Sequence, residues 1–162
     1  MLKRSLFFLS LIVILTLVFI GCSSTSTAAI GKEEGYIKLL YPDANVEYWL
    51  IEEKKLPLDP KAVVEELIRN KNNMIPKETK LLDIKVENKI AYVNLSKEFE
   101  TLSNGDTVGW INIHTIVNTL TLNKNLNIDY VQLLLDGKIK QYIWDTITDK
   151  PIPPNAELMK MY

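Results

Sequence analysis

Apolar and polar positions are arranged along the chain in short, strand-like segments that come in pairs. Tyr36–Tyr41 and Val46–Ile51 flank a Pro-Asp-Ala-Asn turn, so we expect them to form a hairpin. Leu82–Val86 alternates apolar with charged residues, which is the period of a strand with one buried face. Ala91–Leu95 follows after the two-residue turn Asn88-Lys89, and these two segments predict a second hairpin.

A third pair of strand-like segments precedes a proline-rich end. Tyr130–Leu135 and Ile139–Ile147 are joined by Asp136-Gly137, the strongest hairpin signal in the sequence. Proline lacks the backbone N–H that a sheet ladder needs, so the run Pro-Ile-Pro-Pro cannot lie inside a sheet. We therefore expect residues 148–162 to form an extended arm that trails from the domain.

Two segments show the apolar spacing of helices. Asp59 can cap the first free N–H groups of a helix, and Pro60 fits its first position because proline lacks the N–H that would be unpaired there. In each helix the apolar residues fall on one stripe, which predicts an opposite face exposed to water. The stripes consist of Val63, Val64, Leu67 and Ile68 in the first helix, and of Trp110, Ile113, Val117 and Leu120 in the second.

The order of these elements predicts an α+β fold. Along the chain the order is ββαββαββ, with each pair of strands forming an antiparallel hairpin. Two helices and several hairpins imply a two-layer sandwich in which both helices lie on one face of the strands. We expect this domain to occupy residues 36–147.

The first 21 residues have the pattern of a cleaved secretory signal. Two basic residues precede an apolar run from Leu6 to Ile20, and the small residue Gly21 precedes the only cysteine, Cys22. The run is shorter than the roughly 20 residues that span a bilayer comfortably. The arrangement resembles the lipobox of bacterial lipoproteins, with Phe19 where leucine is commonest. The resemblance implies cleavage before Cys22 and a diacylglycerol on its sulfur; the alternative is an uncleaved anchor helix.

Residues 22–35 are expected to form a flexible tether. They begin Cys-Ser-Ser-Thr-Ser-Thr, and chain of this kind buries too little apolar surface to offset the entropy of ordering it. With either a lipid or an uncleaved helix at the N-terminus, the domain is attached to the cell membrane on its extracytoplasmic side.

Composition excludes several classes of function. The predicted signal holds two of the 19 basic residues and none of the 20 acidic residues, so the chain from Cys22 has a net charge of −3. This balance argues against a nucleic-acid partner, which needs a clustered basic surface. One cysteine and one histidine argue against an internal disulfide, a cysteine metal site and a catalytic zinc. We therefore expect no metal and no cofactor.

A few polar residues are candidates for catalytic groups. His114 could act as a general base only with a nucleophile and an orienting carboxylate in reach, and the sequence has no G-x-S-x-G motif. A solvated or hydrogen-bonded helix residue is the simpler interpretation of His114. A glycosidase pair would need one carboxyl group with a raised pKa at a fixed separation from the other. The candidate pairs are Glu98 with Glu100 and Asp145 with Asp149, and no residue is assigned a catalytic role.

The three tryptophans are candidates for the wall of a groove that binds a sugar or a peptide. Trp110 lies on the predicted stripe of the second helix and is expected in the core. Trp49 and Trp144 lie in predicted strands, and their side chains could point either to the core or to the solvent face. The sequence leaves the binding residues unassigned.

Several stretches together resemble the GerMN domain, the sporulation and germination module of spore-forming bacteria. They cover most of residues 36–147 in the expected order, although Asn88-Lys89 stands where this family often has Asp-Gly. The family is similar in layout to ring-building modules of envelope assemblies and is known as non-catalytic. The resemblance therefore implies an assembly role and no enzymatic activity. The matching stretches are Met74–Leu82, Ala91–Ser96 with Glu98-Phe99, Ile116–Thr121 and Val131–Gly137.

These observations give one expected function and one alternative. We expect a lipid-anchored extracytoplasmic protein that binds copies of itself or other envelope proteins during sporulation or germination. Edge strands with unpaired N–H and C=O groups are the expected contact surface. Lys85 and Lys140 are the positions where charge reversal would test it. The alternative is a cell-envelope enzyme or binder that acts on peptidoglycan.

The lipid anchor predicts a specific effect of replacing Cys22. In cells fed a labelled fatty acid, the wild-type chain should carry the label and fractionate with membranes. The Cys22→Ala variant should carry no label, because the sulfur that accepts the diacylglycerol is missing. Each buried CH₂ of an acyl chain contributes about 0.8 kcal/mol, and two or three chains hold firmly. An unlabelled wild-type chain would contradict the lipid anchor.

Overall fold

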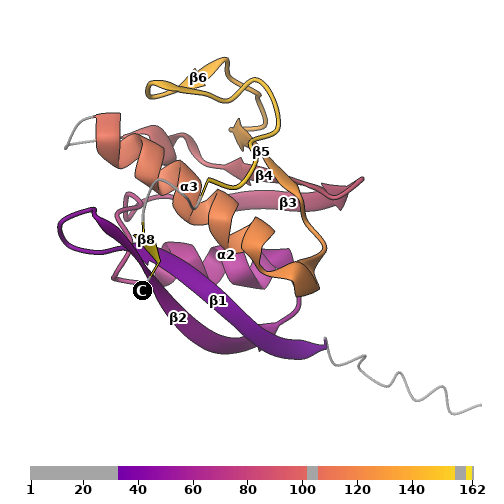
Figure 1. Ribbon diagram of the computed structural model, residues 1–162. Coiled ribbons are helices and arrows are strands. Elements are labelled where there is room, and N and C mark those ends of the chain that lie inside the picture. The colour runs from indigo at the N-terminus through magenta and orange to yellow at the C-terminus, as the bar shows by residue number, and fades with distance from the viewer. Residues whose placement is uncertain (1–32, 102–105, 156–159, 162) are drawn as a thin grey trace, which may run out of the picture. The chain divides into compact units, whose positions relative to one another are not determined.

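Two helices and two three-stranded sheets contribute to one hydrophobic core. The computed structural model describes residues 33–101, 106–155 and 160–161 (Figure 1). The predicted signal peptide, Cys22 and the tether up to residue 32 lie outside the described residues. The α+β class is confirmed, and both helices share the core with buried residues of both sheets.

The first hairpin begins two residues before the predicted start. β1 (Glu34–Pro42) pairs antiparallel with β2 (Tyr48–Pro57). The carboxylate of Asp43 accepts hydrogen bonds from three backbone N–H groups of the turn, including that of Tyr48 at 2.7 Å. These bonds hold the pKa of Asp43 below its usual value, with the bond from Tyr48 as the largest cause. The turn therefore has a local cap that favours the hairpin.

The first predicted helix is confirmed. α2 spans Pro60–Arg69, and the side chain of Asp59 accepts a hydrogen bond from the Lys61 N–H at 3.1 Å. Val63, Val64 and Leu67 are buried, so the predicted stripe faces the core. Beside this stripe, the largely covered carboxylate of Glu66 pairs with Lys54 of β2 at 2.6 Å. Packing and one ion pair thus fix α2 against the first sheet.

The second sheet contains a parallel pair, which corrects the expectation of antiparallel hairpins only. β3 (Leu81–Glu87) and β4 (Ile90–Leu95) form the predicted hairpin, and Asn88 and Lys89 both take positive φ in its turn. β5 (Tyr130–Leu135) then pairs parallel with β4. The chain crosses from one to the other through a helix, and parallel neighbours require such a crossover. This connection consists of η1 (Lys97–Glu100), α3 (Asp106–Leu122) and η2 (Lys124–Leu126).

The second predicted helix is present, but it is not amphipathic. From residue 109 to residue 121 every residue of α3 is buried except Trp110. The helix contacts β1 of the first sheet and β5 of the second (Figure 1). A helix that is covered all round is a core helix, so its polar positions do not mark a solvent face. The buried polar residues of α3 are Asn112, His114, Thr115, Asn118, Thr119 and Thr121.

Polar side chains in and after α3 close the outer edge of β1. The Lys38 N–H donates to Asn123 Oδ1 at 2.9 Å, and Asn123 Nδ2 donates to the Lys38 carbonyl at 2.8 Å. The Leu40 N–H donates to Thr119 Oγ1 at 3.0 Å. At Lys38 and Leu40 these bonds replace those that a neighbouring strand would make, so this part of β1 has partners on both sides.

The predicted return strand from Ile139 to Ile147 is wrong. After the Asp136-Gly137 turn the chain makes one bridge from Leu135 to Lys138 and then leaves β5. It forms a separate small hairpin, β6 (Tyr142–Ile143) with β7 (Thr146–Ile147). Ile143 is buried, and the adjacent Trp144 packs on Phe99 with ring centroids 5.0 Å apart. Two consecutive inward side chains cannot belong to one flat strand, whose side chains alternate between faces.

The C-terminal segment does not trail from the domain. Ile152 is buried and exchanges two backbone hydrogen bonds with Val131 of β5, at 3.0 and 2.7 Å. β8 (Lys160–Met161) pairs parallel with the first two residues of β2. The prolines at 151, 153 and 154 limit the contact with β5 to this one bridge, because none of them can donate a ladder hydrogen bond.

The closure of β1 predicts a large effect of a single asparagine. Asn123→Ala should lower the free energy of unfolding by about 1–3 kcal/mol, because it leaves a partly buried N–H and a partly buried C=O of Lys38 without partners. Asn125 is the matched control, since it is exposed and makes one bond of 3.3 Å to the same strand. Asn125→Ala should cost less than about 0.5 kcal/mol. Denaturant unfolding followed by tryptophan fluorescence measures both, and equal losses would contradict the proposed role of Asn123.

Candidate functional site

His114 is a buried structural residue. It is 4% exposed, and its ring stacks on Trp110 with centroids 4.2 Å apart. Nδ1 lies 3.0 Å from the Trp110 carbonyl, one helical turn earlier, so this nitrogen carries the proton and donates. Burial lowers the pKa of His114, and the bond to the Trp110 carbonyl opposes this shift. The neutral ring therefore fills a core position, as the hydrogen-bonded interpretation predicts.

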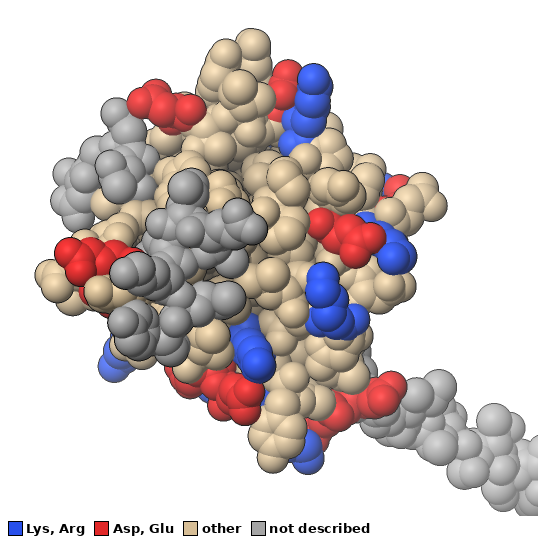
Figure 2. Space-filling model, in the orientation of Figure 1, with Lys and Arg blue, Asp and Glu red and all other residues tan. Residues whose placement is uncertain are grey.

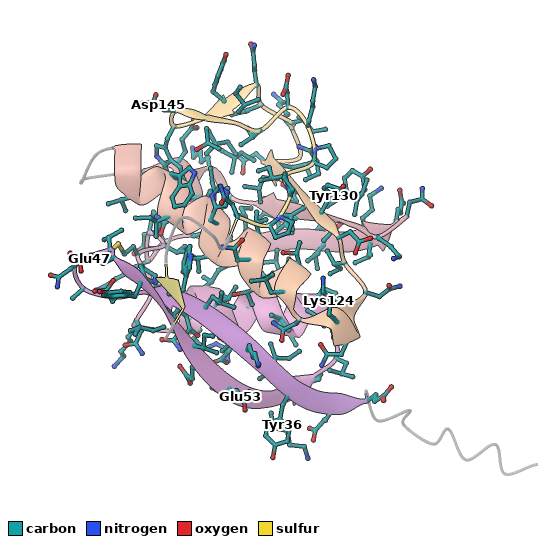
Figure 3. The ribbon with its side chains drawn as sticks, viewed as in Figure 1. Tyr36, Glu47, Glu53, Lys124, Tyr130 and Asp145 are labelled. Atoms are coloured by element: carbon teal, nitrogen blue, oxygen red, sulfur yellow. The ribbon has the colours of Figure 1, made fainter. Side chains whose placement is uncertain are left out.

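The candidate carboxylate pairs lack the electrostatics of a glycosidase. The pKa of Glu98 is lowered, chiefly by the hydrogen bond from the Ser96 side chain, whereas a general acid needs a raised pKa. Glu100 forms an ion pair with Lys140. Asp145 lies at the tip of the hairpin of β6 and β7, and its neighbour Asp149 is exposed (Figure 3). None of these groups is arranged as an acid and a nucleophile around a shared site.

The three tryptophans stabilise the fold. Trp49 is fully buried against Leu40 and Ile111, so it cannot line an open groove. Trp144 donates from Nε1 to the Glu100 carbonyl at 3.1 Å. Its ring also lies directly over Gly109 of α3, where an added Cβ would come within 2.4 Å of it. The rings of Trp49 and Trp144 are therefore fixed by packing and hydrogen bonding within the fold.

A hollow of about 1030 Å³ lies between α2 and the loop that leads to β3. Its walls come from the C-terminal half of α2, from residues 70–80 and from Leu81 at the start of β3. None of the three tryptophans lines it. Sequence reasoning missed this hollow. The available signal was a set of four basic residues, Arg69 at the end of α2 and Lys71, Lys77 and Lys80 in the loop.

The outer edge of β3 is open, unlike the edges of β1 and β5. The hydrogen bonds of the described residues pair β3 with β4 alone, and no described strand lies on its other side. β1 is closed by α3, and Ile152 occupies part of β5. β2 is paired with β8 over only two residues. The edge of β3, Leu81–Glu87, is thus the longest unpaired backbone surface among the described strands of the second sheet.

Side chains on β3 give this edge a mixed character. Leu82 and Val86 are 49% and 41% exposed, which is high for large apolar residues. Lys85 pairs with Glu87 at 3.2 Å, and its ammonium group lies 5.3 Å from the centre of the Tyr92 ring. Charged residues on an edge oppose non-specific pairing, so only a strand of complementary charge is accommodated well. We call Leu81–Glu87 the β3 edge below.

The described surface and core give little support to other kinds of site. Figure 2 shows acidic and basic residues interspersed on one face of the molecule, without a large patch of one sign. Among residues 33–101, 106–155 and 160–161, no three histidine, cysteine, aspartate or glutamate side chains gather to hold a metal ion. None of the helices in these ranges is long and apolar enough to span a membrane.

A family model matches most of the domain, and solved structures of low sequence identity share its fold. Residues 36–141 match the family model Germane, described as sporulation and spore germination. The fold is similar to that of a "Putative Lipoprotein" from Clostridium perfringens, with 20% identity, a TM-score of 0.51, and 76% of this chain and 89% of that chain covered. The tandem GerMN domains of the sporulation protein GerM from Bacillus subtilis match with 15% identity and a TM-score of 0.56, over 79% of this chain. The match spans 46% of that GerM structure. A comparison with curated proteins finds no match.

The buried, neutral His114 predicts a pH-dependent stability. Its pKa is lowered in the folded state, so the unfolded chain binds the proton more readily, and stability is lost as pH falls below about 6.5. The slope is at most about 1.4 kcal/mol per pH unit. His114 is the only histidine, so His114→Gln should remove most of the fall in Tm between pH 7.5 and pH 5.5. If the wild type and His114→Gln showed the same pH dependence of Tm, other titrating groups would be its cause.

Proposed function

Since the chain belongs to the Germane family of sporulation and spore germination domains, we propose that it is a lipid-anchored domain that binds envelope proteins without catalysing a reaction. Its partners are copies of itself or other proteins of an extracytoplasmic assembly that acts in sporulation or germination. The proposal joins three parts: an anchor at Cys22, a folded domain that begins with β1, and the β3 edge as the contact surface. Each part rests on different residues.

The anchor is supported by the sequence and by one structural relative. Cys22 is the only cysteine and follows an apolar signal directly. The Clostridium perfringens protein of similar fold carries the name "Putative Lipoprotein". The predicted tether, residues 22–35, would join this anchor to the domain. Tethering raises the effective concentration of neighbouring domains, so even a weak contact can assemble them.

The single observation that carries the contact surface is the open edge of β3. Unpaired N–H and C=O groups in an extended strand can add a strand from another chain, and side chains of that strand give specificity. Leu82 and Val86 supply apolar contact on this edge, and Lys85 supplies a charge that selects the partner. β1 offers no such surface, because Asn123 and Thr119 already occupy its edge.

A non-catalytic role agrees with the family and with the placement of the candidate groups. GerMN domains are not known as catalytic. The His114 ring is buried within α3 and is bonded to the Trp110 carbonyl, so it cannot reach a substrate. The pKa of Glu98 is lowered, so this carboxyl group is not suited to donate a proton. The alternative of a peptidoglycan binder keeps one observation in its favour, the hollow beside α2.

Charge reversal at Lys85 tests the β3 edge. In cells that carry the anchored protein, chemical crosslinking should give adducts for the wild type and few or none for Lys85→Glu. The substitution should change stability by less than about 0.5 kcal/mol, because the ion pair with Glu87 is exposed. Lys140 does not probe this edge, because it lies just before β6 and outside β3, where it pairs with Glu100.

Lys61→Glu is the matched control, because Lys61 is an exposed lysine in the first turn of α2, outside the β3 edge. It should give wild-type adducts. Equal losses from Lys61→Glu and Lys85→Glu would argue for a general effect of charge. Wild-type protein without adducts, under conditions that trap a known envelope complex, would contradict the assembly role. Adducts with glycan strands alone would favour the peptidoglycan binder.

A further inference from the structure

The loop that forms the wall of the hollow is fixed in place by three asparagines. Asn70 Nδ2 donates to the Tyr41 hydroxyl at 2.7 Å, and Asn73 Oδ1 accepts from the Ile75 N–H at 2.9 Å. From α3, the buried Asn112 donates to the Met74 carbonyl at 3.0 Å. Hydrogen bonds to two other elements thus hold this loop, so the hollow is largely formed before any ligand enters. Preformed sites of this size class are typical of small-ligand binding.

The hollow combines a basic rim with an apolar wall. Four of its lining residues are basic and one, Glu65, is acidic. Arg69 is also in contact with the carboxylate of Glu66, at 3.5 Å, so the three lysines are the main source of positive charge. This excess contrasts with the net charge of −3 of the chain from Cys22. The basic residues are Arg69, Lys71, Lys77 and Lys80, and the apolar ones are Ile68, Met74, Ile75, Pro76 and Leu81.

Thr79 provides an independent sign of a ligand. It lines the hollow and is 4% exposed, and its Oγ1 has no hydrogen-bond partner among the described residues. A buried hydroxyl without a partner costs free energy, and valine would fit the same space without that cost. The Oγ1 atom is itself covered in this structure, so a rotation of the side chain would bring the hydroxyl to a bound acceptor and give it a partner. Its neighbour Lys80 is held by two hydrogen bonds to Ser96, at 2.9 and 3.0 Å.

We propose that the hollow between α2 and β3 binds the free carboxyl end of a peptide with small apolar side chains. Lys77 and Lys80 provide charge for the carboxylate, and Thr79 donates a hydrogen bond to it. The apolar wall accommodates the side chains beside the carboxylate. A polyol phosphate chain would match the positive rim but would leave five apolar lining residues against polar groups, so the peptide end is the better fit.

Calorimetric titration of the full chain in a nonionic detergent tests this proposal. The probes are N-acetylated trialanine with a free carboxylate, the same peptide with a C-terminal amide, and inorganic phosphate. The free carboxylate should bind, and the amide should bind about tenfold more weakly, as expected when a hydrogen bond to a charged group is lost. Equal binding of the two peptides, or tighter binding of phosphate, would overturn the proposal. No heat at peptide concentrations of tens of millimolar would overturn it as well.

Two variants separate binding from folding. Thr79→Val should weaken the carboxylate peptide about threefold or more while leaving the Tm unchanged or higher, because a buried orphan hydroxyl is removed. Lys77→Gln combined with Lys80→Gln should weaken it about three- to tenfold. Lys61→Gln, outside the hollow, should have no effect. The site would be contradicted if Thr79→Val bound the carboxylate peptide as tightly as the wild type does. It would also be contradicted if Lys61→Gln bound the peptide as weakly as the double variant.

Discussion

The backbone N–H and C=O groups on the outer edge of β1 need hydrogen-bond partners, although no described strand lies beside them. The arrangement of the rest of the domain depends on the side chains that provide these partners. Lys38 and Leu40 present backbone groups on the side of β1 that faces α3. Asn123 and Thr119 meet these groups with side-chain oxygens and an amide, as a neighbouring strand would with its backbone. Leaving these backbone groups without partners would cost the free energy of several hydrogen bonds. That loss is comparable with the free energy of unfolding of a small domain.

This arrangement explains why a core helix is rich in polar residues. α3 is covered all round, so each polar side chain on it needs a partner inside the protein. Asn118 bonds the backbone of Asn155 through both ends of its amide, and Asn112 holds the loop beside α2. Since α3 also carries the chain from β4 to β5, the same helix fixes the parallel pair and the edge of β1. The β3 edge is left open because no comparable element lies beside it among the described residues.

Local signals in the sequence were sufficient for α2 and for the turns. The Asp59 cap, the Pro60 start and the apolar stripe are all present as predicted, and Asn88-Lys89 and Asp136-Gly137 form their two-residue turns. What failed depended on distant contacts. The spacing of apolar residues cannot distinguish a helix whose polar face is exposed to water from a helix whose polar face donates hydrogen bonds to, or accepts them from, the backbone of a buried strand. Similarly, nothing local shows that Trp144 turns inward against Gly109, and the hollow arises only when α2 and its loop are assembled.

The bonds between β1 and Asn123 also set the order in which the chain can fold. They join residues that are 85 positions apart. During synthesis the hairpin of β1 and β2 is complete long before residue 123 exists, so its edge stays unpaired for most of that time. Long-range contacts of this kind slow folding and expose unpaired edges to other chains. The edge of β1 is therefore among the last surfaces of the domain to be closed.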